Sequence, residues 1–524
     1  METRQKQSEV LLGLIRDGQP MTRNQKLNLI VQLSIPSILA QITSVMMFFI
    51  DQAMVGRIGV EAAAACGLVE SSTWLCGSLT SAASMGFSVQ VAHFIGANDF
   101  RQARQVFRHG LICALIFSVV IGIIGVSIAP KIPYWLGGGA DIAHDASIYF
   151  GVFMLVMPFF QLNSLAGAML KCSGNMRIPS IMSILMCVMD VIFNFIFIFV
   201  FHFGVLGVAI GTGLAIVIGA LVQAYYAIFR SSMLALVNRE ARSKKQEARD
   251  VTSLEARGKK QEARDVTSLE VRGERREVRD MSSLEARGKK QETRDVTSLE
   301  GREAGERNTW NWSYLTNALK ISLPMACQSI LMSGAQIVST MIVAPLGNIS
   351  IAANTFAITA ESLCYMPGYG IGEAATTLIG QSMGAARREL CRSFARMTVT
   401  MGMLVMAVMG IIMFVTAPQL MALMTPEQSI IDLGAAALRI EAFAEPMFAA
   451  SIVCYSVFVG AGDTLKPAIM NLCSMWLVRL TLAAMLAKDY GLKGVWTAMA
   501  IELTFRGLMF LWRLIRGNWM KKMI

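Results

Sequence analysis

Residues 106–129 read VFRHGLICALIFSVVIGIIGVSIA. Beyond Arg108 and His109 at its start, the stretch carries no basic or acidic side chain. It is too long for a buried strand. A helix that crosses the hydrocarbon core of a bilayer needs about 20 mostly apolar residues. The stretch meets that requirement and predicts a membrane-spanning helix.

Eleven further stretches of low charge have the same character. The chain of 524 residues is 54% hydrophobic and only 16% charged, against about 25% charged residues in soluble domains. This composition excludes soluble, fibrous and disordered classes and predicts an all-α polytopic membrane protein. We expect twelve transmembrane helices, over residues 29–56, 62–95, 106–129, 146–170, 179–201, 205–229, 314–345, 350–380, 394–417, 432–460, 468–487 and 492–514.

The two groups of six helices are related by a constant shift of 288 residues. Because each group has an even number of helices, both begin on the same side of the membrane and the repeats are parallel. Parallel repeats occur in secondary transporters, with the substrate site at the repeat interface. The landmarks that coincide are Ser34-Ile35-Pro36 with Ser322-Leu323-Pro324, Gly96-Ala97 with Gly384-Ala385, Arg104 and Arg108 with Arg392 and Arg396, and Pro158, Gly174 and Pro179 with Pro446, Gly462 and Pro467.

Basic residues predict the orientation. They cluster in the loops after the second, fourth and eighth helices and at the C-terminus, and the positive-inside rule places these segments in the cytoplasm. The basic side chains give the chain a formal net charge of +11. We expect them to contact membrane lipids rather than nucleic acid, since no basic face is interleaved with aromatic residues. The predicted parts are a cytoplasmic N-terminus (1–28), a first lobe (29–229), a cytoplasmic linker (230–313), a second lobe (314–514) and a cytoplasmic C-terminus (515–524).

The linker contains a second repeat that is unrelated to the first. A charged unit of 15 residues recurs four times over 240–299, beginning at Glu240, Glu255, Glu270 and Glu285. Its composition cannot bury a core. We therefore interpret it as a tolerated expansion of a surface loop, with a docking arm as the alternative.

Ionisable residues inside transmembrane helices are costly and are functional candidates. In the first helix, Ser37, Ser44 and Asp51 are spaced by seven residues and share one face with Gln41. In the fifth helix, Asp190 and Asn194 lie one turn apart and also share a face. Asn163 of the fourth helix completes the candidates that we expect to meet in the first lobe.

The second lobe offers a less clear set of acids. The candidates for contact with the substrate or for secondary cation coupling are Glu361, Glu441 and Glu445, together with Gln41 and Ser44 of the first helix. Arg479 and Arg506 provide the alternative, in which these carboxylates only form internal ion pairs. The remaining intramembrane acids are Glu70, Glu373 and Glu502.

A carboxylate in an apolar cavity loses the hydration of its charge. Binding a proton, or Na⁺ together with amide and carbonyl oxygens, removes this cost and biases the conformation. We therefore expect H⁺ or Na⁺ as the coupling ion, with any Na⁺ held transiently at Asp51, Asp190 and Asn194. No cofactor and no resident metal is expected, because the ten cysteines form no CxxC pair and the four histidines are scattered. Five prolines are expected to interrupt helices: Pro36, Pro158, Pro324, Pro367 and Pro446.

Four short motifs, together with the repeat, resemble the multidrug and toxic compound extrusion (MATE) family. They are FIDQAMVG at 49–56, GNMRIP at 174–179, GQSMGA at 380–385 and GAGDTLKP at 460–467. The resemblance implies two six-helix lobes around a central cavity, and export of cationic amphiphilic compounds against H⁺ or Na⁺. It implies a cation-coupling role for Asp51, Asn163 and the pair Asp190/Asn194, whose order is exchanged relative to the usual pattern.

Second-lobe coupling residues of the family are missing at two positions, which hold Met332 and Phe448. The resemblance therefore favours coupling in the first lobe. It implies a monomeric exporter of the bacterial inner membrane that is not an enzyme. The alternatives are a lipid-linked oligosaccharide flippase of the same superfamily and, from other classes, a membrane-embedded enzyme or a channel. We find no HExxH and no phosphate-binding glycine loop, which argues against the enzyme.

Overall fold

The computed structural model describes residues 2–231, 233–236 and 310–520. The repeats at 240–299 and most of the predicted linker lie outside the described residues. Residues 1–234 and 313–524 form one compact unit, and the helices discussed below belong to it. The described residues contain helices and no strand, which confirms the predicted all-α class.

The first lobe contains the helices of residues 23–230. They are α2 (Arg23–Ile58), α3 (Val60–Gly96), α4 (Phe100–Ile128), α5 (Ile132–Trp135), α6 (Ala140–Cys172), α7 (Arg177–Phe195) with its continuation η1 (Ile196–Val200), and α8 (Gly204–Tyr225) with its continuation η2 (Tyr226–Arg230).

The second lobe contains the helices of residues 312–516. They are α11 (Trp312–Val343) with η3 (Ala344–Leu346), α12 (Asn348–Gly384), α13 (Arg388–Ala422), α14 (Gln428–Ala442), α15 (Glu445–Gly460), α16 (Leu465–Cys473) with η4 (Ser474–Arg479), and α17 (Leu480–Arg516).

These elements fit the twelve predicted membrane crossings. Eight helical stretches of the described residues are long and apolar enough to span a bilayer, and the bent pair α14 and α15 makes a ninth. Helices α3 and α12, each of 37 residues, run the length of the bundle beside them. The stretch 465–516 counts as two crossings, because Gly491 leaves the helical conformation with φ 57°.

Prolines break the helices less often than the sequence predicted. Helices α2, α6, α11 and α12 run through Pro36, Pro158, Pro324 and Pro367 without interruption. Only Pro446 coincides with a break, where α14 and α15 meet at 59°. Pro158 is its counterpart in the first repeat, so the duplicated proline coincides with a helix break in the second lobe and not in the first.

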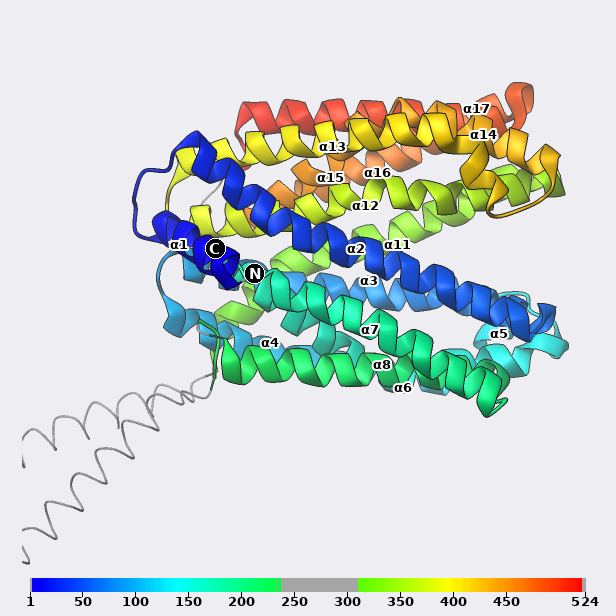
Figure 1. The fold of residues 1–524 in the computed structure, drawn as a ribbon, viewed down its shortest axis with the longest axis horizontal. Helices are drawn as coiled ribbons and strands as arrows, with labels where there is room; N and C mark the ends of the chain where they lie inside the picture. The colour runs from blue at the N-terminus through cyan, green and yellow to red at the C-terminus, as the bar shows by residue number, and fades with distance from the viewer. Residues whose placement is uncertain (1, 232, 237–309, 521–524) are drawn as a thin grey trace, which may run out of the picture. The chain divides into compact units, whose positions relative to one another are not determined.

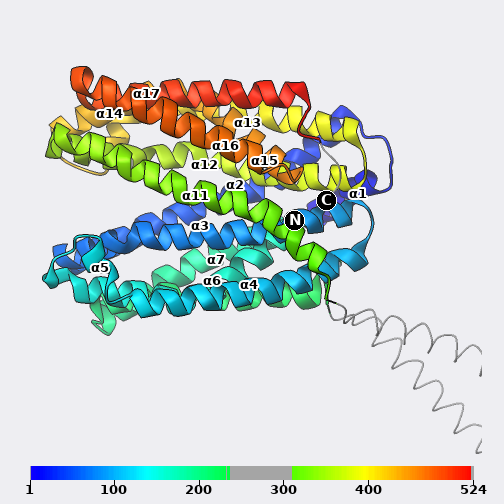
Figure 2. The same ribbon diagram turned by 180° about the vertical axis from the view of Figure 1, so that it is seen from behind.

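Helices α2 and α11 each cross from one lobe to the other (Figures 1 and 2). At its start α2 packs on the second lobe, where Lys26 Nζ donates to Ser393 Oγ at 3.1 Å. At its other end it joins the first lobe through Asp51. Helix α11 does the reverse, since Tyr314 OH donates to Gln105 Oε1 of α4 at 3.1 Å. Lys26 and Tyr314 are 288 residues apart, so the two contacts occupy equivalent positions in the two repeats.

The two lobes are closed against each other at the end of the bundle that carries both chain termini and the Arg-rich loops, here called the basic end (Figure 1). Helices α3 and α12 meet there so closely that a methyl group on Gly96 would overlap the Gln381 carbonyl oxygen. A methyl group on Gly384 would likewise overlap that of His93. His93 Nε2 hydrogen-bonds Gly460 O at 2.9 Å, and Gln381 Nε2 donates to Cys172 O at 2.9 Å. Each contact has its repeat-related partner.

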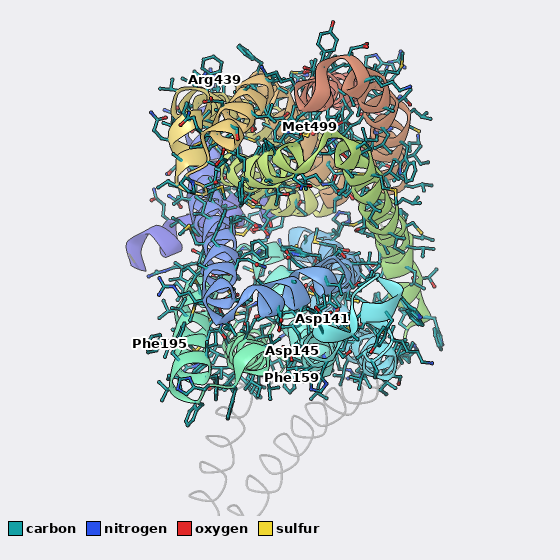
Figure 3. All side chains as sticks on the ribbon, turned by 90° about the vertical axis from the view of Figure 1, so that its right-hand side faces the viewer. Asp141, Asp145, Phe159, Phe195, Arg439 and Met499 are labelled. Atoms are coloured by element: carbon teal, nitrogen blue, oxygen red, sulfur yellow. The ribbon has the colours of Figure 1, made fainter. Side chains whose placement is uncertain are left out.

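The opposite end, called the far end, lacks such a junction among the described residues. The clusters of buried apolar side chains near it each lie within one lobe. The clusters that join the lobes, around Phe458 and around Val89, lie toward the basic end. Figure 3 looks onto the far end, with Asp141 and Asp145 in one lobe and Arg439 and Met499 in the other.

The polar N-terminus contains a helix that the sequence does not predict. Helix α1 (Glu2–Arg16) buries Leu12 and Ile15 in the cluster around Phe458. Its last carbonyls accept hydrogen bonds from both lobes, because Arg387 Nη1 donates to Leu14 O at 2.8 Å and Asn98 Nδ2 donates to Arg16 O at 3.3 Å. The helix therefore spans the closed junction.

The close approach of α3 and α12 predicts that either glycine is intolerant of a side chain. Replacing Gly96 or Gly384 by alanine forces backbone against backbone, and overpacking of this kind costs about 1–3 kcal/mol. We expect each variant to lower the melting temperature in detergent by several degrees.

Gly67→Ala on the same helix is the matched control, because nothing lies within 4 Å of its added methyl group. Equal melting temperatures for Gly96→Ala and Gly67→Ala would contradict the tight junction.

Candidate functional site

Asp51 and Asn194 meet between α2 and α7. Asn194 Nδ2 donates to Asp51 Oδ1 at 3.0 Å and lies 3.4 Å from Thr212 Oγ1 of α8. Asn194 is fully buried, whereas the next residue, Phe195, is 55% exposed and lies at the edge of the first lobe in Figure 3. The structure thus brings together two of the predicted residues, although they are 143 positions apart.

Asp190 extends this pair into a site with two carboxyl groups. Its side chain is fully buried beside Asp51, Thr212 and Asn194. Neither carboxylate oxygen of Asp190 accepts a hydrogen bond from a described residue, and the Asn194 side-chain oxygen accepts none either. Two neighbouring carboxylates cannot both stay charged without a proton or a cation between them. The arrangement can therefore take up H⁺ or a monovalent cation.

Asn163 has other hydrogen-bond partners than the Asp51 set. Its backbone oxygen accepts from Gln223 Nε2 of α8 at 2.9 Å, and its own side-chain oxygen is buried without a partner. No hydrogen bond of the described residues joins it to Asp51, Asp190 or Asn194.

Gln41 and Ser44 share the helix of Asp51 but have other partners. Gln41 Nε2 donates to Glu373 Oε1 of α12 at 3.1 Å. Lys171 Nζ of α6 forms an ion pair with the same oxygen at 2.5 Å. Ser44 Oγ donates to the backbone oxygen of Ala40 at 3.0 Å. Gln41 thus belongs to a polar junction between the lobes, which the sequence did not reveal because the ion-pair partners are 202 residues apart.

The three candidate acids of the second lobe are buried. Glu441 lies near the end of α14 and Glu445 begins α15, so the break at Phe443–Ala444 separates them. No carboxylate oxygen of Glu441 or Glu445 accepts a hydrogen bond from a described residue. Glu361 of α12 lies within the electrostatic reach of Arg479 and Arg506.

One acid of this lobe is accounted for by an internal ion pair. Arg506 Nε lies 3.3 Å from Glu502 Oε1, and Ser474 Oγ donates to that oxygen at 2.5 Å. Arg506 also lies over the Phe448 ring at 5.5 Å. Among the described residues, Arg506 thus pairs with Glu502 rather than with Glu361, Glu441 or Glu445, for which internal pairing is the predicted alternative.

No group of three or more His, Cys, Asp or Glu side chains in the described residues is arranged to hold a metal ion. A cation at Asp51 and Asp190 would draw its remaining ligands from the oxygens of Asn194 and Thr212. Such oxygen ligands suit a hard cation.

The ion pair between Lys171 and Glu373 predicts a measurable coupling between the lobes. Both side chains are about a quarter exposed, so we expect a double-mutant cycle of Lys171→Met and Glu373→Gln to give about 1 kcal/mol, decreasing with added salt. The exposed pair Arg392–Glu389 is the control and should give no measurable coupling. Equal values for both pairs would contradict a specific junction.

Comparison with known proteins places this geometry in a family. The family model described as MatE matches residues 36–196 and again residues 324–485. The probable multidrug resistance protein NorM of Thermotoga maritima is 22% identical over 501 residues, which cover 94% of this chain and 93% of that relative. The uncharacterized transporter YisQ of Bacillus subtilis is 20% identical over 90% of each chain.

Solved structures share the fold. A MOP superfamily transporter from Pyrococcus furiosus aligns with a TM-score of 0.78 at 20% identity, over 95% of this chain and 97% of that one. A multidrug resistance MATE family transporter in an outward-facing conformation aligns with the same values. Since the family model covers more than half of the chain, once in each six-helix repeat, the chain belongs to the MatE family, as its sequence motifs predict.

Proposed function

We propose that the chain is a secondary active multidrug exporter that moves cationic amphiphilic compounds out of the cell in exchange for H⁺ or Na⁺. The observation that carries this proposal is the contact of half-buried Asp51 with the fully buried residues Asp190 and Asn194, which joins α2 to α7. The Thermotoga maritima relative, a probable multidrug resistance protein, supports the substrate class. We further propose a monomer in the bacterial inner membrane, surrounded by membrane lipids.

Helix α2 can transmit the state of the ion site to the other lobe. Asp51 and Gln41 are ten residues apart, which is about 15 Å along a helix. Asp51 is held by the first lobe, whereas Gln41 contacts Glu373 of the second lobe. A cation that changes the charge at Asp51 therefore acts on a helix whose two ends belong to different lobes. Differential binding of this kind shifts a conformational equilibrium.

The positive-inside rule assigns the basic end, with both termini, to the cytoplasm. The lobes are closed at that end by Gly96, Gly384 and their neighbours, so the described conformation is outward-facing. In this state we expect the coupling ion to enter from outside and the exported compound to leave.

Asn163 and the acids of the second lobe have secondary roles in this proposal. Asn163 offers a buried side-chain oxygen near α8, without a partner. Glu361, Glu441 and Glu445 could contact the compound or bind a second cation, because Glu441 and Glu445 are buried without hydrogen bonds.

The proposal is tested by uptake of a fluorescent organic cation into proteoliposomes, with a proton gradient and a sodium gradient imposed separately. We expect one gradient to drive transport and Asp51→Asn to abolish it, because the amide cannot exchange a proton or neutralise Na⁺. The variant should insert and melt like the wild type.

Asp489→Asn is the matched control, because Asp489 is an exposed acid of α17, and it should transport normally. Normal transport by Asp51→Asn would refute the coupling site. Absence of wild-type transport under both gradients would refute the exporter and make lipid-linked sugars the next substrates to test.

A further inference from the structure

Helix α3 carries a stripe of exposed residues on the face that is turned toward the second lobe. Its members recur at intervals of three, four and seven residues, which places them on one helix face. Trp74 is the large side chain of this stripe and is 62% exposed. The others are small or polar, unlike a face that meets lipid: Gly67, Ser71 and Ser81.

The lobe that this stripe faces can be inferred from the residues that continue the stripe toward the basic end. Met85 is eleven residues, or about three turns, after Trp74 and therefore lies on the same face. It packs against the cluster of Val89, Ile321 and Val459, which joins the two lobes. A methyl group on Gly86 would overlap the backbone of Ala318 in α11. The face that carries Trp74 is thus turned to the second lobe and is uncovered beyond this contact.

A carboxylate lies beside the exposed indole. Trp74 Nε1 donates to Glu70 Oε1 at 3.2 Å, and Gln52 Nε2 of α2 donates to Glu70 Oε2 at 3.3 Å. The rings of Phe48 and Trp74 meet edge to face, with centroids 6.1 Å apart. Among the described residues no Lys or Arg forms an ion pair with Glu70. Its charge is therefore oriented by neutral donors and is not neutralised.

A carboxylate without a cationic partner, next to aromatic faces, fits an organic cation. The face of an indole ring attracts a cation by about 0.5–2 kcal/mol, and quaternary ammonium ligands are recognised by aromatic groups. A small inorganic cation would instead need several converging oxygens, as at Asp51 and Asp190. The two sites therefore differ in the ligand that they suit.

We propose that Glu70, Trp74, Phe48 and Gln52 form the recognition site of the first lobe for a bulky quaternary ammonium or phosphonium cation. The inference rests on the proposed export function and names the contacts that select its substrate.

The position of this site explains how the coupling ion and the compound exclude each other. Asp51 and Gln52 are consecutive residues of α2, and they contact Asn194 and Glu70 respectively. Tyr149 of α6 lies within the electrostatic reach of Asp51, Glu70 and Asp190. A cation at Asp51 therefore reduces the negative potential at Glu70. Loading of the coupling ion weakens the hold on the compound, as exchange requires.

The test is equilibrium binding of radiolabelled tetraphenylphosphonium to the purified full chain. Replacing Glu70 by glutamine keeps partners for Gln52 and Trp74 but removes the charge, so we expect the dissociation constant to rise at least about tenfold. Trp74→Leu should raise it similarly, whereas Trp74→Phe retains an aromatic face and should raise it less. Glu70→Asp should restore part of the affinity.

Glu61→Gln is the matched control, because Glu61 is an exposed acid in the first turn of the same helix, and it should bind like the wild type. Unchanged affinity in both Glu70→Gln and Trp74→Leu, in protein of normal melting temperature, would overturn the inference. If Glu70→Gln is unstable, the order of Trp74→Phe and Trp74→Leu decides, and equal affinities would overturn it.

The gradient-driven uptake assay separates this failure from that of the exporter itself. Wild-type uptake that is lost in Asp51→Asn but has an unchanged KM in Glu70→Gln would overturn this inference alone. Absence of any gradient-driven uptake by the wild type would overturn the export function and this inference with it.

Discussion

The contact between α3 and α12 at Gly96 and Gly384 is the constraint on which the rest of the structure depends. Backbone meets backbone there without side chains between, so the junction is either closed or broken and has little room for intermediate positions. If the lobes separated at this end, the buried side chains of His93 and Gln381 would lose their hydrogen bonds to the backbone oxygens of Gly460 and Cys172. Closure at one end thus fixes both lobes and leaves the other end without a matching contact in the described residues.

The fold was predictable because its signals are carried by many residues at once. Twelve low-charge stretches and one shift of 288 residues identify the class, the repeats and the approximate helix limits. The break at Pro446 was not separable from the continuous helix at Pro158, since the two prolines occupy equivalent positions and differ only in packing. Helix α1 escaped prediction for a related reason: Leu12 and Ile15 form an apolar patch too short to signal a helix before its docking surface is known.

The site was predictable in part. Asp51, Asp190 and Asn194 could be named from helix spacing, and the structure brings them together. Gln41 lies on the expected face of α2 but contacts Glu373, because the crossing of α2 gives its two ends different neighbours. No spacing within one helix reveals such a crossing. Glu70 was equally hard to single out, because its proposed role in binding depends on its contacts with Gln52 and Trp74 and not on its own position in α3.

The residues of the junction between the lobes follow the repeat, whereas the acids of the candidate site do not. The junction residues recur after 288 positions, as His93 and Gln381 or Gly96 and Gly384 do. The acids do not: Asp51 corresponds to Ser339, and Asp190 corresponds to Val478. In the proposed mechanism the symmetric junction lets the two lobes separate, whereas the carboxylates that take up the coupling cation in the first lobe have no repeat-related counterparts. Because α2 carries that charge and also contacts the second lobe, occupancy of one site in the first lobe can act on the symmetric junction.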